Sequence, residues 1–193
     1  MSNVDRPNGF RPVKYISGAP YNGAYTKYYS DVDNLFLGDL VEQDTAGQAG
    51  RQGGVYPTCD RVDNAGDTIQ GVVVGWEPDP AALDRKYHAA STTYAVYVAD
   101  ARNLVMESQS DDATMVTGDV GLNISPTVTA GSTTTGLSNM ELDGDTAATT
   151  STLTLKIVGA VDRPDNDASS SVANQRWLVT VNEHVFSFHN TGV

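Results

Sequence analysis

The sequence predicts a mainly β fold, arranged as a β-sandwich, a jelly-roll-like structure or a partly closed barrel. Two observations lead to this prediction. Short apolar segments rich in β-branched residues recur along the chain, and Gly, Pro, Asp and Asn residues that favour turns separate them. Helical periodicity is scarce, so we expect one short helix. A length of 193 residues fits one domain with an appended arm.

Residues 1–30 are expected to form an extended N-terminal arm, ahead of a β domain at residues 31–193 with long Ser/Thr/Gly-rich loops. Pro7, Pro12 and Pro20 supply no amide to a strand ladder. The segment is nevertheless rich in tyrosine, and aromatic side chains bury a large area at low conformational cost. Two interpretations remain open: the segment wraps its own domain, or it lies on a neighbouring subunit or another partner.

After the arm, apolar and β-branched segments indicate the strands. The strongest is residues 68–76, in which three consecutive valines stand between glycines. Residues 153–158 and 177–182 alternate in the manner of half-buried strands. Residues 125–154 are dominated by Thr, Ser, Ala and Gly and are expected to form long loops and edge strands. The full set of predicted strands is 35–41, 68–76, 92–98, 104–109, 153–158 and 177–182.

The expected helix is residues 79–87. Asp79 can cap a free amide, and Pro80 would occupy the first helical position, where its missing amide does no harm. The segment is long enough for about two turns. Residues 110–117 contain a weaker candidate for a single helical turn.

The charge of the chain restricts its partners. The 12 Lys and Arg residues stand against 24 Asp and Glu residues, which gives a formal net charge of −12. Nucleic acid and anionic membranes are therefore not expected as partners. The single Cys59 cannot form an intrachain disulfide, and the polar N-terminus lacks the apolar stretch of a signal peptide. We expect synthesis in a cytoplasm without a secretion signal.

Motifs for catalysis or metal binding are not found. His184 and His189 lack the spacing of common zinc motifs. The acidic segments at 143–145 and 162–167 do not form a complete calcium loop, and such segments are typical of turns. Cys59 has no Lys or His beside it that would activate its thiol. The sequence predicts no enzyme, no metal and no cofactor.

Seven residue runs carry a family resemblance: DRPNGFRPVK at 5–14, GAPYNG at 18–23, FLGD at 36–39, GVVVGWEPD at 71–79, KYHAAS at 86–91, GLSNMELD at 136–143 and RWLVTVNEH at 176–184. In this order the chain resembles the small virion structural proteins that decorate or cement the capsids of tailed bacteriophages. The resemblance implies a β-rich homodimer or homotrimer on the outer face of the virion capsid. It also implies synthesis in the host cytoplasm and a role in bridging adjacent major capsid protein subunits.

The mechanism we expect is mechanical. The arm grips adjacent capsid proteins through apolar anchors, and Arg6 and Arg11 pair with capsid carboxylates. An outward position also suits the charge of −12, because packaged DNA would repel it. Two alternatives are a glycan-binding or host-surface module displayed on the virion and a head-completion or tail component. The predicted capsid or subunit contacts are Arg6, Phe10, Arg11, Tyr15, Tyr21, Tyr25 and Tyr28.

Overall fold

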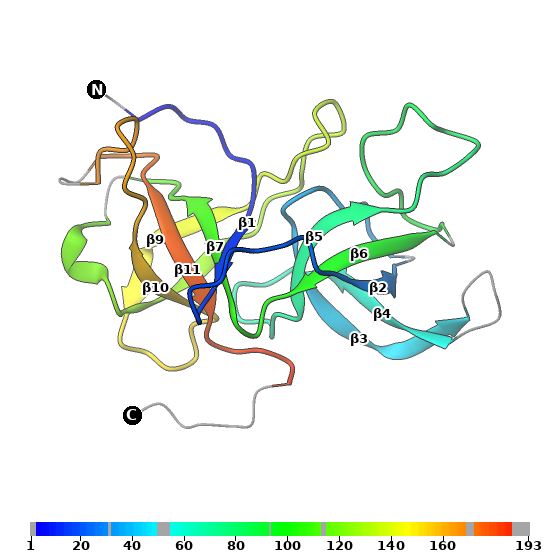
Figure 1. Cartoon of the computed structure of the whole chain (residues 1–193), viewed down its shortest axis with the longest axis horizontal. Helices are drawn as coiled ribbons and strands as arrows, with labels where there is room; N and C mark the ends of the chain where they lie inside the picture. The colour runs from blue at the N-terminus through cyan, green and yellow to red at the C-terminus, as the bar shows by residue number, and fades with distance from the viewer. Residues whose placement is uncertain are drawn as a thin grey trace.

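The computed structural model describes residues 3–30, 32–49, 55–92, 94–112, 115–168 and 172–186. Two β structures lie side by side along the long axis of the molecule, a six-stranded sheet and a closed five-stranded barrel (Figure 1). The prediction of a mainly β fold with a partly closed barrel is confirmed.

The barrel consists of β2 (Thr26–Tyr29), β4 (Val55–Arg61), β3 (Leu40–Ala49), β5 (Gly71–Trp76) and β6 (Ala95–Asp100), in that order around its wall. Neighbouring strands are antiparallel except for β2 and β4, which close the barrel in parallel through Tyr29 and Thr58. Val73 and Val98 point into the barrel, where they pack with Tyr28. The predicted strands at 68–76 and 92–98 therefore correspond to β5 and β6, which lie next to each other.

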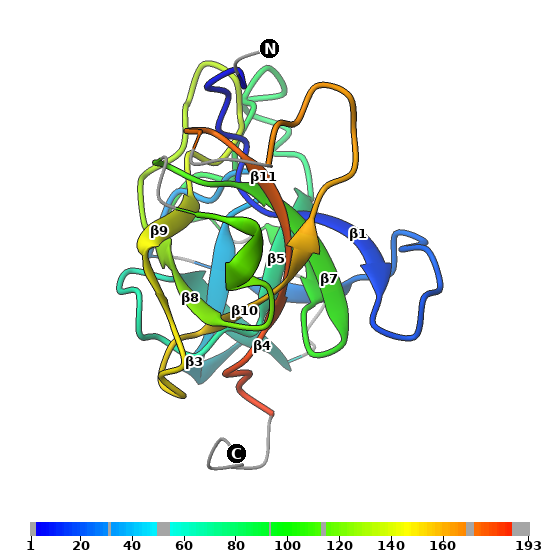
Figure 2. The same ribbon diagram turned by 90° about the vertical axis from the view of Figure 1, so that its left-hand side faces the viewer.

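The six-stranded sheet has the order β1 (Arg11–Tyr15), β7 (Leu104–Gln109), β11 (Arg176–Val181), β10 (Leu155–Ala160), β8 (Asn123–Thr127) and β9 (Glu141–Ala148). All neighbouring pairs are antiparallel. Just beyond β7 the Asp111 amide donates to the Leu142 carbonyl of β9 at 3.0 Å, so the sheet curls back toward its own middle (Figure 2). β9 is the last strand in this order, within the residues 125–154 that were expected to supply edge strands, and Leu142 also bridges to Ser110 after β7.

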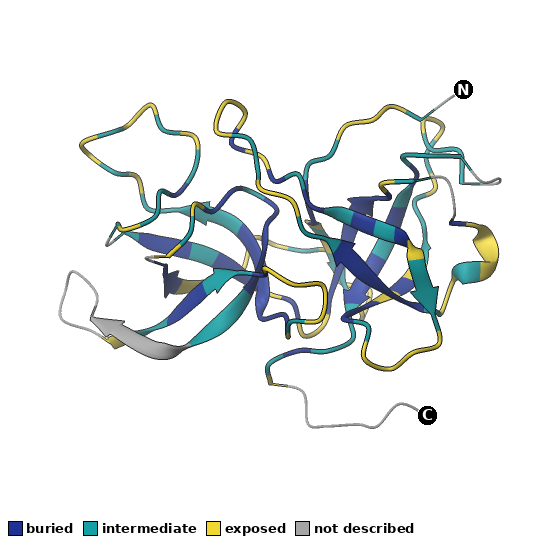
Figure 3. Cartoon of the chain, turned by 180° about the vertical axis from the view of Figure 1, so that it is seen from behind, coloured by how far each residue is buried: buried dark blue, intermediate teal, exposed yellow. Residues whose placement is uncertain are grey.

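One hydrophobic core joins the barrel and the sheet. It contains Leu40 and Val72 from barrel strands, Leu155 and Trp177 from the sheet, and Phe10 from the segment before β1. Each of these five side chains has an exposed fraction of 0%. Figure 3 shows buried residues on the strands of both β structures. Because a buried apolar side chain contributes about 1.5–3 kcal/mol, a shared core makes each β structure depend on the other.

The structure places most of the predicted N-terminal arm inside the fold. β1 pairs with β7 in the sheet, whereas β2 pairs with β6 in the barrel. Residues 3–10 cross the sheet without strand pairing. They are held by side chains: the Arg6 amide donates to Gln109 Oε1, and the Arg176 guanidinium donates to the Arg6 carbonyl, both at 3.0 Å. This differs from the expected arm because the apolar residues of the segment, above all Phe10, fill the core.

Residues 79–87 form consecutive turns instead of the expected helix. The Asp79 carboxylate accepts a hydrogen bond from the Ala81 amide at 2.9 Å, as a helix cap would. The turns do not continue, because a two-turn helix depends on burying an apolar face and Leu83 is exposed. In the described part of the chain the helical element is the 3-10 turn η1 (Thr117–Asp119), at the end of the weaker candidate. None of the described segments is a helix long and apolar enough to cross a membrane.

Segments distant in sequence meet at a junction between the barrel and the sheet. The Phe10 amide donates to the Gly38 carbonyl at 2.9 Å, and the Gly38 amide donates to the Val73 carbonyl of β5 at 2.9 Å. Gly9 has a positive φ of 67°, and a side chain there would overlap the Gly38 carbonyl and the Ser138 side chain. Glycine is required at position 9 because only a residue without Cβ tolerates this φ and this close approach.

Candidate functional site

Three of the predicted contact residues, Tyr15, Tyr21 and Tyr25, come together around one open groove, here named the tyrosine groove. It has a volume of about 280 Å³ and lies between the loop that joins β1 to β2 and the turn that joins β6 to β7. Figure 2 shows the segment after β1 projecting from the side of the molecule. The residues that line the groove are Tyr15, Tyr21, Ala24, Tyr25, Thr26, Asp100, Arg102 and Asn103.

Main-chain hydrogen bonds fix the loop that carries the tyrosines. The Tyr15 amide donates to the Ala19 carbonyl at 2.8 Å, and the Tyr21 amide donates to the Val13 carbonyl at 3.0 Å, so the loop folds back along β1. The amide of residue 16 donates to the carbonyl of residue 103 at 2.8 Å, which ties the loop to the β6–β7 turn. A surface held in this way has little conformational entropy to lose when a partner binds.

Apolar and aromatic side chains extend from this part of the molecule into solvent. The exposed fraction is 60% for Ile16, 51% for Tyr25 and 40% for Val13. Tyr25 stacks on Tyr97, with 4.5 Å between the ring centroids. The ammonium group of Lys27 lies 5.7 Å from the centroid of the same Tyr97 ring. Large apolar side chains gathered on a projecting surface are typical of protein interaction sites.

The Asp100 carboxylate at the groove is engaged by groups of its own chain. Its Oδ1 lies 3.3 Å from His184 Nε2 and accepts a hydrogen bond from the Arg102 amide at 3.0 Å. Its Oδ2 accepts one from the Gln70 side chain at 3.3 Å. The hydrogen bond to His184, against the opposing effect of burial, lowers the pKa of Asp100. Asp100 is therefore ionised at neutral pH, and its half-exposed carboxylate adds a negative charge to the groove beside Arg102.

The other predicted contact residues lie away from the groove. Phe10 and Tyr28 are buried, in the shared core and in the barrel, so their rings are not free to anchor a partner. Burial raises the pKa of Tyr28 to about 12, so its hydroxyl stays protonated. Arg6 is held against the sheet through its backbone, whereas Arg11 is exposed on β1. The sequence did not distinguish the buried from the exposed aromatic residues of this segment. Prolines interrupt it, so it has no alternation of apolar and polar residues that would show which side chains face the core.

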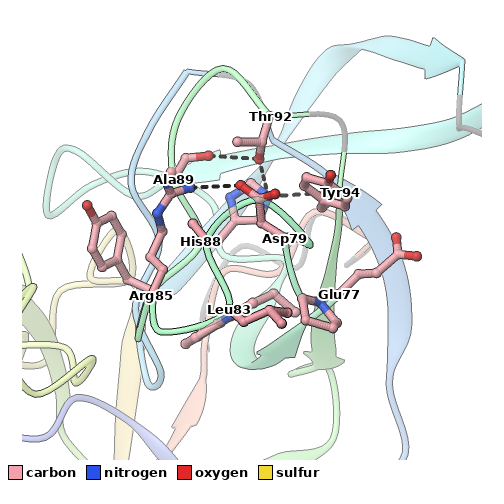
Figure 4. Close-up of a pocket in the computed structure, with 12 residues that line it drawn as sticks. Glu77, Asp79, Leu83, Arg85, His88, Ala89, Thr92 and Tyr94 are labelled. Carbon is pink, nitrogen blue, oxygen red and sulfur yellow. Dashed lines mark hydrogen bonds and ion pairs between the residues drawn. The ribbon is translucent and has the colours of Figure 1, made fainter.

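A second, smaller pocket is lined by residues within 76–92 and by Tyr94 (Figure 4). At its wall Asp79 pairs with Arg85 at 3.3 Å. His88 Nε2 lies 3.0 Å from the Tyr94 carbonyl, to which it must donate because a carbonyl oxygen only accepts. Burial lowers the pKa of His88, so the ring is neutral at pH 7 and carries its proton on Nε2. The volume of about 40 Å³ holds roughly three water molecules, which is too little for a sugar ring.

Of these two sites the tyrosine groove is the stronger candidate, because it is larger than the pocket beside His88 and is built on a fixed loop that carries three of the predicted contact residues. Sequence reasoning found its tyrosines but missed Arg102 and Asn103, which reach the groove only through the pairing of β6 with β5 and β2. Within the described ranges, no three His, Cys, Asp or Glu side chains lie close enough together to hold a metal ion. Comparison of the chain with protein-family models, with curated proteins and with solved structures found no match.

Proposed function

We propose that this chain is a virion structural protein that binds the outer surface of a tailed-phage capsid and stabilises the head by holding adjacent major capsid protein subunits together. The observation that carries the proposal is the fixed, projecting segment at the tyrosine groove: Tyr25 lines the groove and is exposed, and Val13 and Ile16 of the same segment are exposed as well. The resemblance of the seven residue runs to capsid decoration proteins supports the same function. The proposed partners are the major capsid protein and further copies of this chain.

A preformed aromatic surface suits a protein that works by adhesion. Tyrosine buries a large area and loses few rotatable bonds on binding. An interface of standard size buries roughly 1,600 Å² in total, so the groove would be the centre of a larger contact. The net charge of −12 keeps the remaining surface well hydrated at the high local concentration of a capsid shell.

The proposal is tested by adding the purified protein to capsids that lack it and measuring occupancy. The double variant Ile16→Ser, Tyr25→Ala removes two exposed side chains and leaves the core intact. We expect its capsid affinity to fall at least about tenfold, because central aromatic residues commonly dominate interface energies. The control is Val158→Ser, which changes another exposed apolar residue, on β10 of the sheet. Deleting residues 2–20 is unsuitable, because it removes Phe10 from the core and β1 from the sheet.

Unchanged occupancy by a folded double variant would contradict the assignment of this surface. An aromatic groove can also stack against sugar rings, so the same variants are screened on a glycan array. Glycan binding that the double variant loses, in a protein without capsid affinity, would favour the host-surface module instead. The number of copies per particle, measured by quantitative gel densitometry, separates a capsid protein from a head-completion or tail component, which is present in far fewer copies.

A further inference from the structure

The positive charges of this acidic chain are unevenly distributed. Residues 6–30 contain Arg6, Arg11, Lys14 and Lys27 and no Asp or Glu. The rest of the chain therefore has 8 cationic side chains and all 24 acidic ones. The segment that carries the tyrosines is thus a cationic part of a protein whose net charge is −12.

The fold places cations beside the groove. Arg102, from the β6–β7 turn, lines it directly. Lys27 lies over the Tyr97 ring, on which Tyr25 stacks. Lys14 is on β1 immediately before Tyr15, but it is not among the residues that line the groove. Among the residues that the structure describes, none of Lys14, Lys27 and Arg102 forms an ion pair.

Asp100, the acidic residue that lines the groove, offsets part of this charge, because its side chain is 48% exposed and its carboxylate interacts electrostatically with Arg102. Both oxygens of Asp100 face donors of the chain itself, namely His184, the Gln70 side chain and the Arg102 amide. The Arg102 guanidinium is a different group from that amide, and it is exposed. Lys27 and Arg102 together still exceed the single carboxylate at the groove, so this part of the surface keeps an excess of positive charge.

We propose that the tyrosine groove binds a carboxylate-rich polypeptide segment of the capsid protein. Carboxylates of that segment pair with Lys27 and Arg102, and an apolar side chain between them packs against Tyr15 and Tyr25. The argument is charge complementarity: a local cationic surface on an otherwise acidic protein attracts acidic partners and repels basic ones. This inference rests on the proposed function and names the chemistry of its partner.

A polypeptide is favoured over nucleic acid by the same charges. Two cations beside a groove match one or two carboxylates, whereas a nucleic-acid strand extends its phosphates beyond the groove toward the acidic remainder of the chain. A stretch of phosphates would therefore meet repulsion on both sides of the site. Oligothymidine is accordingly included in the test as a competitor.

The experiment measures binding by fluorescence anisotropy. The probes are a fluorescein-labelled peptide of alternating glutamate and phenylalanine, a matching peptide of lysine and phenylalanine, and fluorescein-labelled oligothymidine. We expect binding of the glutamate peptide alone, weakening as salt is raised. The double variant Lys27→Glu, Arg102→Glu should bind it about tenfold more weakly, because two attractions become repulsions. The control Lys156→Glu makes the same kind of change at an exposed position on β10 and should bind normally.

The same variants are then tested for occupancy of capsids, which separates this inference from the proposed function. If capsid affinity depends on Ile16 and Tyr25 but not on Lys27 and Arg102, the inference is wrong and the proposed function stands. If no variant and no wild-type protein binds capsids, the proposed function is wrong, and selective binding of the glutamate peptide would still support an acidic ligand for the groove. Stronger binding of the lysine peptide or of oligothymidine overturns the inference. The inference is also wrong if wild-type molecules associate with one another and this association displaces the glutamate peptide.

Discussion

Asp39 is a carboxylic acid enclosed at the junction between the barrel and the sheet, with an exposed fraction of 0%. Its Oδ2 accepts a hydrogen bond from the Phe36 amide at 2.8 Å. Burial, which outweighs hydrogen bonds from Ser138 and Phe36, raises the pKa of Asp39 to about 6. The folded protein therefore takes up a proton here at a higher pH than the unfolded chain does.

This single residue gives the protein a pH dependence with a definite sign. Ionised Asp39 lowers the free energy of unfolding by up to about 3 kcal/mol above pH 6, and the effect disappears below about pH 4, where both states are protonated. Asp39→Asn keeps an acceptor for the Phe36 amide without the charge. We expect the variant to gain stability relative to wild type as the pH rises from 4 to 7.

The measurement is the melting temperature of both proteins across this pH range. The informative quantity is the difference between the two melting temperatures, because His88 adds a pH dependence of opposite sign to both proteins. Burial lowers the pKa of His88, so wild type and variant alike lose stability as the pH falls below the pKa of free histidine. A difference that stays constant with pH would show that Asp39 titrates normally.

At the scale of elements, the strands that the sequence predicted are those whose β-branched side chains pack in a hydrophobic core. β5, β6, β7, β10 and β11 overlap predicted segments, since their valines, isoleucines and leucines alternate or run together. β1, β4 and β8 were missed because Pro12, Pro57 and Pro126 lie within them. A proline is tolerated where its missing amide has no ladder partner, as at the sheet edge for Pro12. The sequence alone does not reveal which side of a strand is unpaired.

The junction offers a sharp test of these local constraints. Gly9→Ala adds a Cβ where the Gly38 carbonyl and Ser138 already lie, and it does so at a φ of 67°. We expect the free energy of unfolding to fall by about 3 kcal/mol or more, because the new Cβ must displace the Gly38 backbone, and this cost adds to that of the unfavourable φ. The matched control is Gly23→Ala, with a φ of 82° and open space around it, which should cost about 1 kcal/mol. Equal losses in urea denaturation would mean that the close approach at Gly9 is unimportant.

At the scale of the whole molecule, the shared core decides how the protein unfolds. Leu40 lies in the barrel but packs in the same cluster as Trp177 of the sheet. This pairing was not foreseeable, because the sequence pattern shows which residues are apolar but not that two β structures bury them against each other. The groove has the same origin: its tyrosines were predicted, whereas Arg102 reaches them only through the fold.

We therefore expect a single cooperative unfolding transition. Leu40→Ala should lower the free energy of unfolding by about 3 kcal/mol, and tryptophan fluorescence, which includes Trp177 of the sheet, should shift together with circular dichroism. Calorimetry checks this through agreement of the calorimetric and van't Hoff enthalpies. Two separate transitions, with only one moved by the substitution, would show instead that the barrel and the sheet unfold independently.

The closed wall of the barrel has a consequence for how neighbours can attach. A closed barrel has no free edge strand to which a strand of another protein could be added. On the outer edge of β1 in the sheet, residues 19–21 already form main-chain hydrogen bonds with β1. Attachment at these places must rely on side chains alone. Such adhesion can be tuned or abolished by exchanging individual residues while the scaffold beneath stays intact.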